Sequence, residues 1–596
     1  MSVARVYRVG SPYNGSELAE VDFEQSADTM YIAHIDHIPT KLVRAGHTDW
    51  TFSDLTFAPK IAMPTALAVV VTNPNQDVPN GGNAYFPQTA SYVVSAVDDD
   101  LLQESRPTAA VSATNDLTLK RNKNTLSWTA ATGAERYRVY KADNTGDYGY
   151  IGSTTSTSFI DDNVGPDFSD GPIKGETPFP GVNQYPSTVS FFQQRLFWAR
   201  TNNRPNAIWG SRSGDYENHD TSRPLKDSDA LSFALVAGRV NAVAQLASMS
   251  DLLALTSDSV FKIGGDQAGY VTPSNIITNR ENGRGSSRLS PLVIDNVVFY
   301  QTSVANSIRT LNYFFDNDGY KSNDVTIFSP HLFRGFQIVS WAYAQEPRSA
   351  IWAARDDGKL LCFTWEQEQQ VWGWTLCDVG GIVQSVCAIS ESGEDRLYMV
   401  VNRTINGVAK YYIERMAATR WSGVENCCFL DCATTYIFDT PSTVLNNLER
   451  LEGQTVAALA DGNVVPGMVV AGGKVTLPFA ATTVTVGLTF TALVETLPLA
   501  IQSKAGWTIA KPQQASSVVL KLVESRGVRV GPTEAKVDEL RGRSIEAWGA
   551  PNALITGNVV AALRPDNNDG VHVVVTSPDP LPLTLTGVLI DPAISE

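Results

Sequence analysis

The sequence of 596 residues lacks several features, and each absence excludes a class of protein. It has no run of 18 apolar residues, so we expect no transmembrane helix. Its first twenty residues hold no apolar signal-peptide core, and we expect assembly in a cytoplasm. Neither a P-loop nor a serine–histidine–aspartate order occurs. The sequence therefore predicts that the chain is not an enzyme, has no catalytic or metal site and binds no cofactor.

Cysteine is scarce, and its spacing does not favour a metal site. No two cysteines form a CxxC pair, and no histidine lies near the cluster at 427–432. A structural zinc site needs a second ligand pair at ordinary spacing. We therefore expect free thiols in apolar surroundings at all six positions, Cys362, Cys377, Cys387, Cys427, Cys428 and Cys432.

Histidine is equally scarce, and three of the six histidines lie close together near the N-terminus. His34, His37 and His47, with Asp36, have the residue types of a metal site. However, two residues three apart on an extended strand point to opposite faces. We expect His34 and His37 to be separate polar residues of an edge strand.

Basic runs are absent, and the overall charge is acidic. The chain has 46 Lys and Arg against 62 Asp and Glu, a net charge of −16. Proteins that grip DNA carry a basic stripe that neutralises phosphates. The acidic charge therefore excludes proteins that bind DNA tightly. It is compatible with a protein that DNA passes without binding.

Helical periodicity is nearly absent, whereas short alternating runs of Val, Ile, Thr and Tyr are frequent. Turn markers such as Asn406-Gly407 and Asp461-Gly462 separate these runs. With 44 Gly and 31 Pro, the pattern predicts an all-β chain of several domains. Short helices are expected only within 442–459 and, more weakly, near Glu534.

Five similar segments follow one another within residues 173–416. Each reads as a strand, a turn, a stronger apolar strand, a loop and a third strand. They recur at intervals of roughly 44 to 53 residues, which is typical of β-propeller blades. The segments begin at Ser187, Val240, Ser290, Gln337 and Gly381.

The stretch from Gln193 to Asp220 lies in the first of these segments. Phe197 and Trp198 are neighbours on one strand, so each must face a different adjoining blade. Four further tryptophans should likewise fill the space between blades. They are Trp352, Trp365, Trp372 and Trp374.

The polar end of the same stretch has the residue types of an acid/base strip. Asp215, Glu217 and His219 alternate along the chain, and propeller glycosidases pair carboxylates across a central cleft. The sialidase S-x-D-x-G-x-T-W box is absent, and the nearby arginines all lie in one blade. These arginines are Arg195, Arg200, Arg204 and Arg212. We interpret Asp215, Glu217 and His219 as part of a loop over the propeller rim.

Three other regions flank the blades. Residues 1–63 form a short N-terminal β segment, and residues 64–172 resemble an immunoglobulin or fibronectin type III sandwich with Trp128 in its core. The hairpin that resembles F–G precedes the one that resembles B–C, so either one permuted sandwich or two partial ones are present. Residues 417–596, rich in Val and Thr, predict a C-terminal β-rich region.

Long, ordered motifs resemble the tail nozzle proteins of short-tailed bacteriophages, also called tail tubular protein B. The resemblance covers residues 17–596. It implies a virion structural protein, with residues 417–596 as the β-rich nozzle. The motifs are QQRLFWA…PNAIWGSRSGDYENHD…DSDALSF from Gln193, DGYKSNDVTIFSPHLF from Asp318, AYAQEPRSAIWAARDDGKLLCFTWEQEQQVWGW from Ala342, MVVNRTINGVAKYYIERM from Met399 and LERLEGQTVAALADG from Leu448.

The resemblance also implies partners and a location. It predicts a homo-hexameric ring in the virion tail, below the head-to-tail adaptor, in contact with tail fibres or spikes. Double-stranded DNA would pass through its channel without specific binding, and an acidic wall would repel phosphates at short range. The alternative is a propeller-bearing tail adhesin or glycan depolymerase, which would need a trimeric stalk repeat or paired carboxylates in a cleft.

Overall fold

The protein is all-β in the residues that the computed structural model describes. Those residues form strands and five three-residue 3-10 helices, with no α-helix among them. The chain divides into two compact units, Val6–Pro330 and, mainly, His331–Glu596. The described ranges are 7–74, 85–100, 102–142, 146–236, 241–266, 269–500, 502–503, 506–507, 512–541, 546–547, 549–564 and 570–594. The all-β, multi-domain, propeller-like fold predicted from the sequence is confirmed.

The unit Val6–Pro330 contains four separate four-stranded antiparallel sheets of the propeller-blade type. The first sheet contains β1 (Asp22–Ser26), β2 (Thr29–His34), β3 (His37–Gly46) and β4 (Asp49–Asp54). The second contains β14 (Thr188–Phe192), β15 (Arg195–Ala199), β16 (Ala207–Gly210) and β18 (Leu231–Ala234). The third contains β19 (Val243–Ser248), β20 (Leu252–Thr256), β21 (Val260–Gly264) and β22 (Ile277–Asn282). The fourth contains β23 (Leu292–Ile294), β24 (Val297–Gln301), β25 (Ile308–Phe314) and β26 (Gly319–Asp324).

The predicted repeats correspond to these sheets. The first strands of the second, third and fourth sheets begin at Thr188, Val243 and Leu292, within three residues of the predicted starts. The sheet β1–β4 has the same construction, and β1 lies against β14. Sequence reasoning did not recognise it as a repeat, because β1 has the polar sequence DFEQS.

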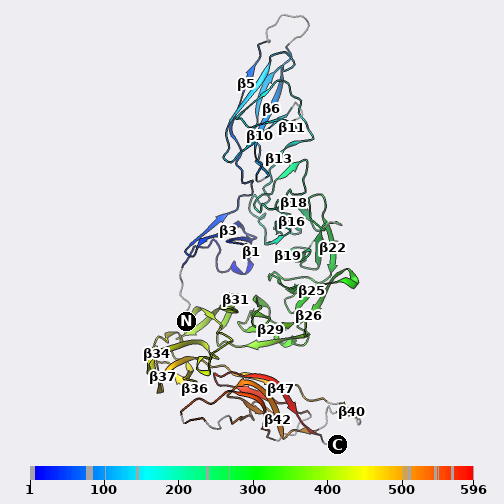
Figure 1. Cartoon of the computed structure of the whole chain (residues 1–596). Coiled ribbons are helices and arrows are strands. Elements are labelled where there is room, and N and C mark those ends of the chain that lie inside the picture. The colour runs from blue at the N-terminus through cyan, green and yellow to red at the C-terminus, as the bar shows by residue number, and fades with distance from the viewer. Residues whose placement is uncertain are drawn as a thin grey trace. The chain divides into compact units, whose positions relative to one another are not determined.

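A β-sandwich is inserted between the first and second sheets (Figure 1). One of its sheets contains β11 (Tyr148–Thr154), β10 (Arg136–Ala142), β6 (Gln88–Asp98), β7 (Gln103–Glu104) and β8 (Val111–Asn115). The other contains β12 (Ser158–Asp161), β9 (Lys123–Thr129) and β5 (Thr65–Thr72). Both predicted hairpins share one core with Trp128, and β6 pairs with β10, so there is one sandwich rather than two partial ones. A short ladder joins β13 (Gly171–Lys174) to β17 (Thr221–Arg223).

The second unit begins with two further sheets of the propeller-blade type. One contains β27 (Ile338–Ala344), β28 (Ala350–Arg355), β29 (Leu360–Glu366) and β30 (Val371–Cys377). The other has three strands, β31 (Ile382–Glu391), β32 (Glu394–Ile405) and β33 (Val408–Arg415). Their first strands also begin one residue after the predicted starts, at Ile338 and Ile382.

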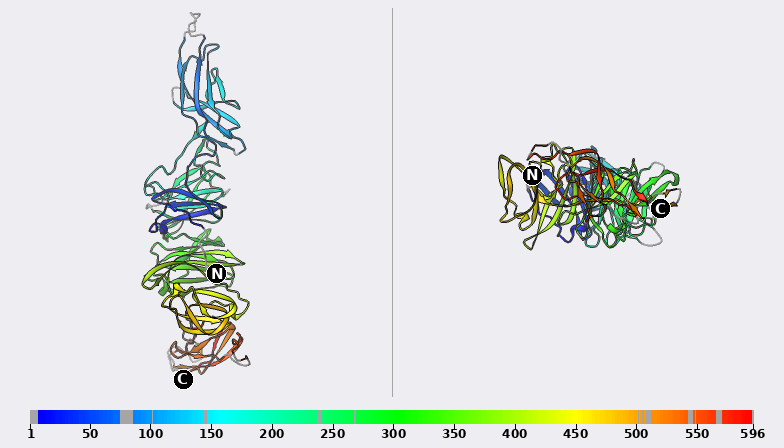
Figure 2. Two further views of the ribbon diagram at one scale, coloured as in Figure 1. Left: turned by 90° about the vertical axis from the view of Figure 1, so that its left-hand side faces the viewer. Right: turned by 90° about the horizontal axis from the view of Figure 1, so that it is seen from below.

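The C-terminal region has two well-packed parts, each with its own apolar core. The first is the sheet β34 (Asp431–Leu445), β37 (Val475–Leu488), β35 (Thr455–Ala460) and β36 (Asn463–Val469), drawn in yellow tones in Figure 2. The second pairs the sheet β45 (Ile555–Ala562), β42 (Ser517–Ser525) and β47 (Thr584–Ile590) with the sheet β38 (Ala492–Glu495), β46 (Val574–Ser577), β43 (Arg529–Gly531) and β44 (Asp538–Glu539). Two short ladders join β39 (Gln502–Ser503) to β40 (Gly506–Trp507) and β41 (Gln513–Gln514) to β48 (Ala593–Ile594).

The helices expected from the sequence are almost entirely missing from the described residues. Within 442–459 the chain ends β34, makes one 3-10 turn at η5 (Glu449–Leu451) and enters β35. Apolar residues at helical spacing there face the core of the sheet instead. The other 3-10 turns are η1 (Leu18–Glu20), η2 (Phe315–Asn317), η3 (Pro330–Leu332) and η4 (Val424–Asn426). Near Glu534 the described residues form β44, and residues 542–545 lie outside them.

Candidate functional site

The strand β15 is buried along its whole length, and its two aromatic side chains point to opposite faces. Phe197 packs with residues of the neighbouring sheet β19–β22, including Leu246. Trp198 packs in a different cluster, with Tyr31 of β2. The prediction that these neighbours face different sheets is therefore confirmed.

The four later tryptophans differ from one another in burial. Trp365 is buried, whereas Trp352 and Trp374 are half-buried. Trp372 is 46% exposed, because it lies on β30, the edge strand of its sheet. The expectation of filler between blades holds for Trp352, which packs in a cluster with Val383 of the next sheet, and fails for the exposed Trp372.

The polar loop after β16, which the sequence predicts as a loop over the propeller rim, is largely buried. The side chains of Asp215, His219 and Asp220 are all less than a tenth exposed. Buried polar groups need partners, since an unpaired one is costly. Here most of the partners come from the sandwich and from the segment between β4 and β5. We call Arg106, Asp215, Glu217, His219 and Asp220 the polar junction.

Asp220 is fully buried and holds Arg106, which lies between β7 and β8 of the sandwich. The guanidinium donates to both carboxylate oxygens at 2.7 and 2.8 Å. It also donates to the carbonyls of Phe57 and Glu176 at 2.6 and 2.8 Å. The hydrogen bonds that Arg106 donates to Asp220 raise the pKa of Arg106. One arginine thus connects the sandwich to three other segments.

Asp215 and Glu217 bind separate partners and do not form a carboxylate pair. Asp215 accepts a hydrogen bond from Gln103 of β7 at 2.8 Å. Glu217 pairs with Lys41 of β3 at 2.6 Å. Each carboxylate is already used to connect a different strand, so the geometry does not provide the two-carboxylate cleft of a glycosidase.

His219 is buried among aromatic rings. Its ring lies 5.2 Å from Phe57 and 6.5 Å from Phe179, in edge contacts. Burial lowers the pKa of His219 to about 3. The imidazole is therefore neutral at physiological pH, which suits packing against rings.

The nearby arginines hold the same loop together rather than gather at an anion site. Arg195 donates to the carbonyls of Ser211 and Asp229, and burial lowers the pKa of Arg195 to about 10. Arg212 pairs with the buried carboxylate of Asp229 at 3.1 Å. Arg204 instead lies over the Trp209 ring, 5.8 Å from its centroid.

His34 and His37 lie together, against the expectation that they face opposite sides. β2 ends at His34 and β3 begins at His37, so the two form a cross-strand pair beside a tight turn. Their ring centroids are 4.9 Å apart, and Tyr13 contacts both rings. His37 also pairs with Glu17 at 3.2 Å. The prediction was wrong because a hairpin turn separates His34 from His37, so the two residues do not lie on one extended strand.

Asp22 and Glu24 of β1 form a carboxylate pair that the sequence did not reveal. Asp22 is buried and accepts hydrogen bonds from the Thr188 and Ser290 hydroxyls at 2.6 and 2.8 Å. Burial and the nearby Asp22 raise the pKa of Glu24 to about 7. Since Asp22 is already hydrogen-bonded to two neighbouring segments, its role is to join sheets. In the sequence, the polar run DFEQ is the only feature that indicates this role of Asp22.

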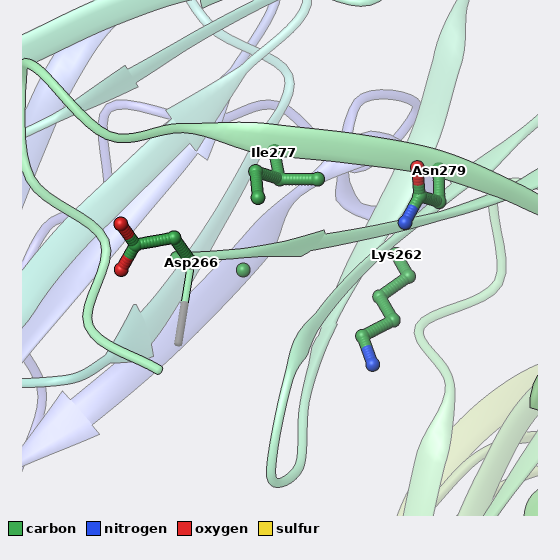
Figure 3. A pocket seen from close by; sticks show the side chains of 6 residues that line it. Lys262, Asp266, Ile277 and Asn279 are labelled. Carbon is green, nitrogen blue, oxygen red and sulfur yellow. The ribbon is translucent and has the colours of Figure 1, made fainter. Parts of the chain in front are cut away.

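A small pocket of about 310 Å³ opens beside β21 and β22. Figure 3 shows the charged ends of Lys262 and Asp266 pointing in different directions. Lys262 already pairs with Asp251 at 3.2 Å. The remaining lining residues are Gly264, Gly265, Ile277 and Asn279, none of which is a strong acid, base or nucleophile.

All six cysteines are free thiols, but Cys387 is exposed, so the expectation of apolar surroundings does not hold at every position. Cys427 is buried, and burial raises its thiol pKa to about 12. In the described part of the chain, no group of three or more His, Cys, Asp and Glu side chains is placed to hold a metal ion. No helix among the described residues is both long and apolar enough to cross a membrane.

Comparisons with known proteins give likeness in fold alone. No family model matches the chain, and no curated protein matches it. A solved protein from Lactobacillus plantarum is similar at 10% identity and a TM-score of 0.22, covering 55% of this chain and 96% of that one. A periplasmic gluconolactonase of Pseudomonas aeruginosa is similar at 11% identity and a TM-score of 0.24, covering 55% and 99%. YCF48 bound to a D1 peptide is similar at 11% identity and a TM-score of 0.27, covering 67% and 94%.

One of these comparisons corrects a prediction. The sequence predicted that the chain is not an enzyme, and the gluconolactonase among the similar structures is one. That prediction is contradicted, since a fold of this kind does occur in enzymes. At this level of identity the likeness assigns no reaction to the present chain.

Proposed function

We propose that the chain is a structural subunit of the tail nozzle of a short-tailed bacteriophage. In this proposal six copies form a ring in the virion tail, below the head-to-tail adaptor, and ejected DNA passes through it. Two sequence features support the proposal: the ordered motifs across residues 17–596 and the net charge of −16. An acidic wall repels phosphates within about 10 Å at moderate salt.

The structural observation that carries the proposal is a row of three aliphatic side chains in the C-terminal region, of which the central one is half-buried and the outer two are exposed. Val519 of β42 is directly paired with Val560 of β45 on one side and Leu589 of β47 on the other. Val560 is 71% exposed and Leu589 is 57% exposed. We call these three residues the aliphatic row. A contiguous apolar row on a sheet face is typical of an interaction surface.

The opposite face of the same sheet packs into a core, unlike the face that carries the aliphatic row. There Val518, Leu520 and Leu522 are fully buried in the core of this region. Among the described residues, β45 and β47 each pair only with β42. Exposed edges beside an apolar face invite pairing with another chain. A second copy of this subunit would cover both features.

The experiment compares two lysine substitutions in the purified full-length chain. Val560→Lys places a charge in the aliphatic row, and Val70→Lys places one at a similarly exposed position of the sandwich strand β5. Sedimentation velocity and negative-stain imaging should show six-fold rings for the wild type and for Val70→Lys. Val560→Lys should remain monomeric at the same concentrations.

Two results would count against the nozzle. One is a wild-type chain that stays monomeric at every concentration. The other is equal assembly of both variants, which would remove the aliphatic row from the interface. A monomer that releases reducing ends from a bacterial capsular polysaccharide would favour the alternative, a tail glycan depolymerase.

A further inference from the structure

Four polar side chains meet between the two sheets of the sandwich. Tyr92 and Lys141 are direct cross-strand partners on β6 and β10. Asn124 and Asp161 are direct cross-strand partners on β9 and β12 of the facing sheet. Tyr92, Asn124 and Asp161 are almost completely buried, and the Lys141 side chain is 11% exposed. Two cross-strand pairs from opposite sheets therefore face each other inside the sandwich.

The closest contact in this group joins an amine to a carboxylate. The Lys141 Nζ lies 2.8 Å from the Asp161 Oδ2. The same amine donates to the Val164 carbonyl at 3.2 Å, which fixes its direction. An ion pair removed from water gains little net stability, because desolvation offsets the attraction. A reaction that consumes both charges removes that penalty.

The two oxygens of Asp161 have different surroundings, as an acyl-transfer centre requires. Oδ1 accepts the backbone N–H groups of Asn163 and Val164 at 3.0 and 2.8 Å. Oδ2 accepts the Tyr92 hydroxyl at 2.7 Å, and Asn124 donates to that hydroxyl at 2.8 Å. Two backbone donors on one oxygen are the geometry that stabilises a tetrahedral oxyanion. A hydroxyl donor on the other oxygen marks it as the leaving group.

We propose that Lys141 and Asp161 form an intramolecular amide bond after the sandwich folds. The new bond joins the Lys141 Nζ to the Asp161 Cγ, and the bond from Cγ to Oδ2 breaks. The ammonium group first transfers one proton to Oδ2 across the ion pair, which leaves a neutral amine and a neutral carboxylic acid. Attack on Cγ then places the negative charge on Oδ1.

The step balances without another reactant. Nζ loses a second proton as the tetrahedral intermediate collapses, and Oδ2 leaves with both protons as water. Nothing is oxidised or reduced, and no cofactor is consumed. Holding the two reacting groups in contact within a dry core supplies the proximity that makes amide formation feasible. The product is a covalent link between β10 and β12, and hence between the two sheets.

The test is the intact mass of the purified full-length chain under denaturing conditions. The proposal predicts a mass lower than the sequence mass by one water molecule. A tryptic digest should leave the bond after Lys141 uncut and yield one branched peptide that contains Lys141 and Asp161. Lys141→Arg keeps the positive charge but lacks the amine, so its mass should equal its full sequence mass.

A second lysine provides the matched control. Lys41 contacts the Glu217 carboxylate at 2.6 Å, a similar distance in a more exposed pair. Its substitution Lys41→Arg should leave the water loss intact. Tyr92→Phe should reduce the linked fraction in freshly refolded protein. A wild-type chain at its full sequence mass, with trypsin cutting after Lys141, would overturn the proposal and establish a simple ion pair.

Discussion

Two strands, β15 and β42, carry apolar side chains on both faces but differ in how they are covered. In β15, Phe197 and Trp198 point in opposite directions and both are buried by neighbouring sheets. In β42, Val518 is buried on one face, whereas Val519 lies on the other within the aliphatic row. The same sequence pattern thus gives a strand packed on both faces in one region and a strand packed on one face in the other.

The difference shows that apolar side chains on both faces of a strand predict burial of both faces. They do not predict whether the same chain or another chain covers each face. In the Val6–Pro330 unit, other sheets of the same chain pack on both faces of the sheet that contains β15. Among the described residues of the C-terminal region, one face of the sheet β45–β42–β47 packs into an apolar core, whereas Val560 and Leu589 on the other face are exposed. Substitutions in the two regions should therefore affect different properties, stability in the first and association in the second.

The largest loss of stability is expected at Trp198. Trp198→Ala should lower the free energy of unfolding of its unit by about 3–5 kcal/mol, because it leaves a large cavity between sheets. Trp352→Ala should cost less, since Trp352 is only half-buried. Urea unfolding followed by circular dichroism measures both. An equal loss at the two positions would contradict the link between burial on both faces and stability.

The next largest effect concerns the polar junction. Asp220→Ala leaves the Arg106 guanidinium without its carboxylate, and should cost about 2 kcal/mol. The control is Asp99→Ala, which removes the exposed partner of Arg136 and should leave unfolding unchanged. The same urea transitions measure both variants. If Asp220→Ala behaved like the control, the junction would not hold the sandwich to the blade-like sheets.

The buried imidazole of His219 predicts a dependence of stability on pH. Its folded pKa of about 3 lies below the ordinary 6.5, so the folded state binds fewer protons. Its contribution to stability is full above about pH 6.5 and falls as the pH drops toward 3. At pH 5 the loss should be roughly 2 kcal/mol. His219→Gln should flatten this part of the pH profile, and an unchanged profile would refute neutral burial.

The smallest effect on stability is expected in the aliphatic row. Val560→Lys should change the free energy of unfolding by less than about 0.5 kcal/mol, as is usual for exposed positions. Its effect should appear in association, which sets it apart from Trp198→Ala. A large loss of stability in the monomer would show that the chain itself already covers this face.

The sequence predicted the fold where local patterns decide it. The repeat starts near Ser187 and Val240 and the core role of Trp128 follow from alternation and spacing, and the structure agrees. The sheet β1–β4 was not recognised because Asp22 and its neighbours are polar and satisfied by distant residues. The buried state of Asp215 was missed for the same reason, since Gln103 is remote in sequence.

Amide hydrogen exchange, compared between the monomer and the assembled ring, tests the central claim most directly. The account predicts fast exchange along the outer edges of β45 and β47 in the monomer, and slow exchange there in the ring. Exchange in β15 and β16 should be slow in both forms, because the chain itself covers them. Equal protection of β45 and β47 in monomer and ring would contradict the claim that another subunit completes this sheet.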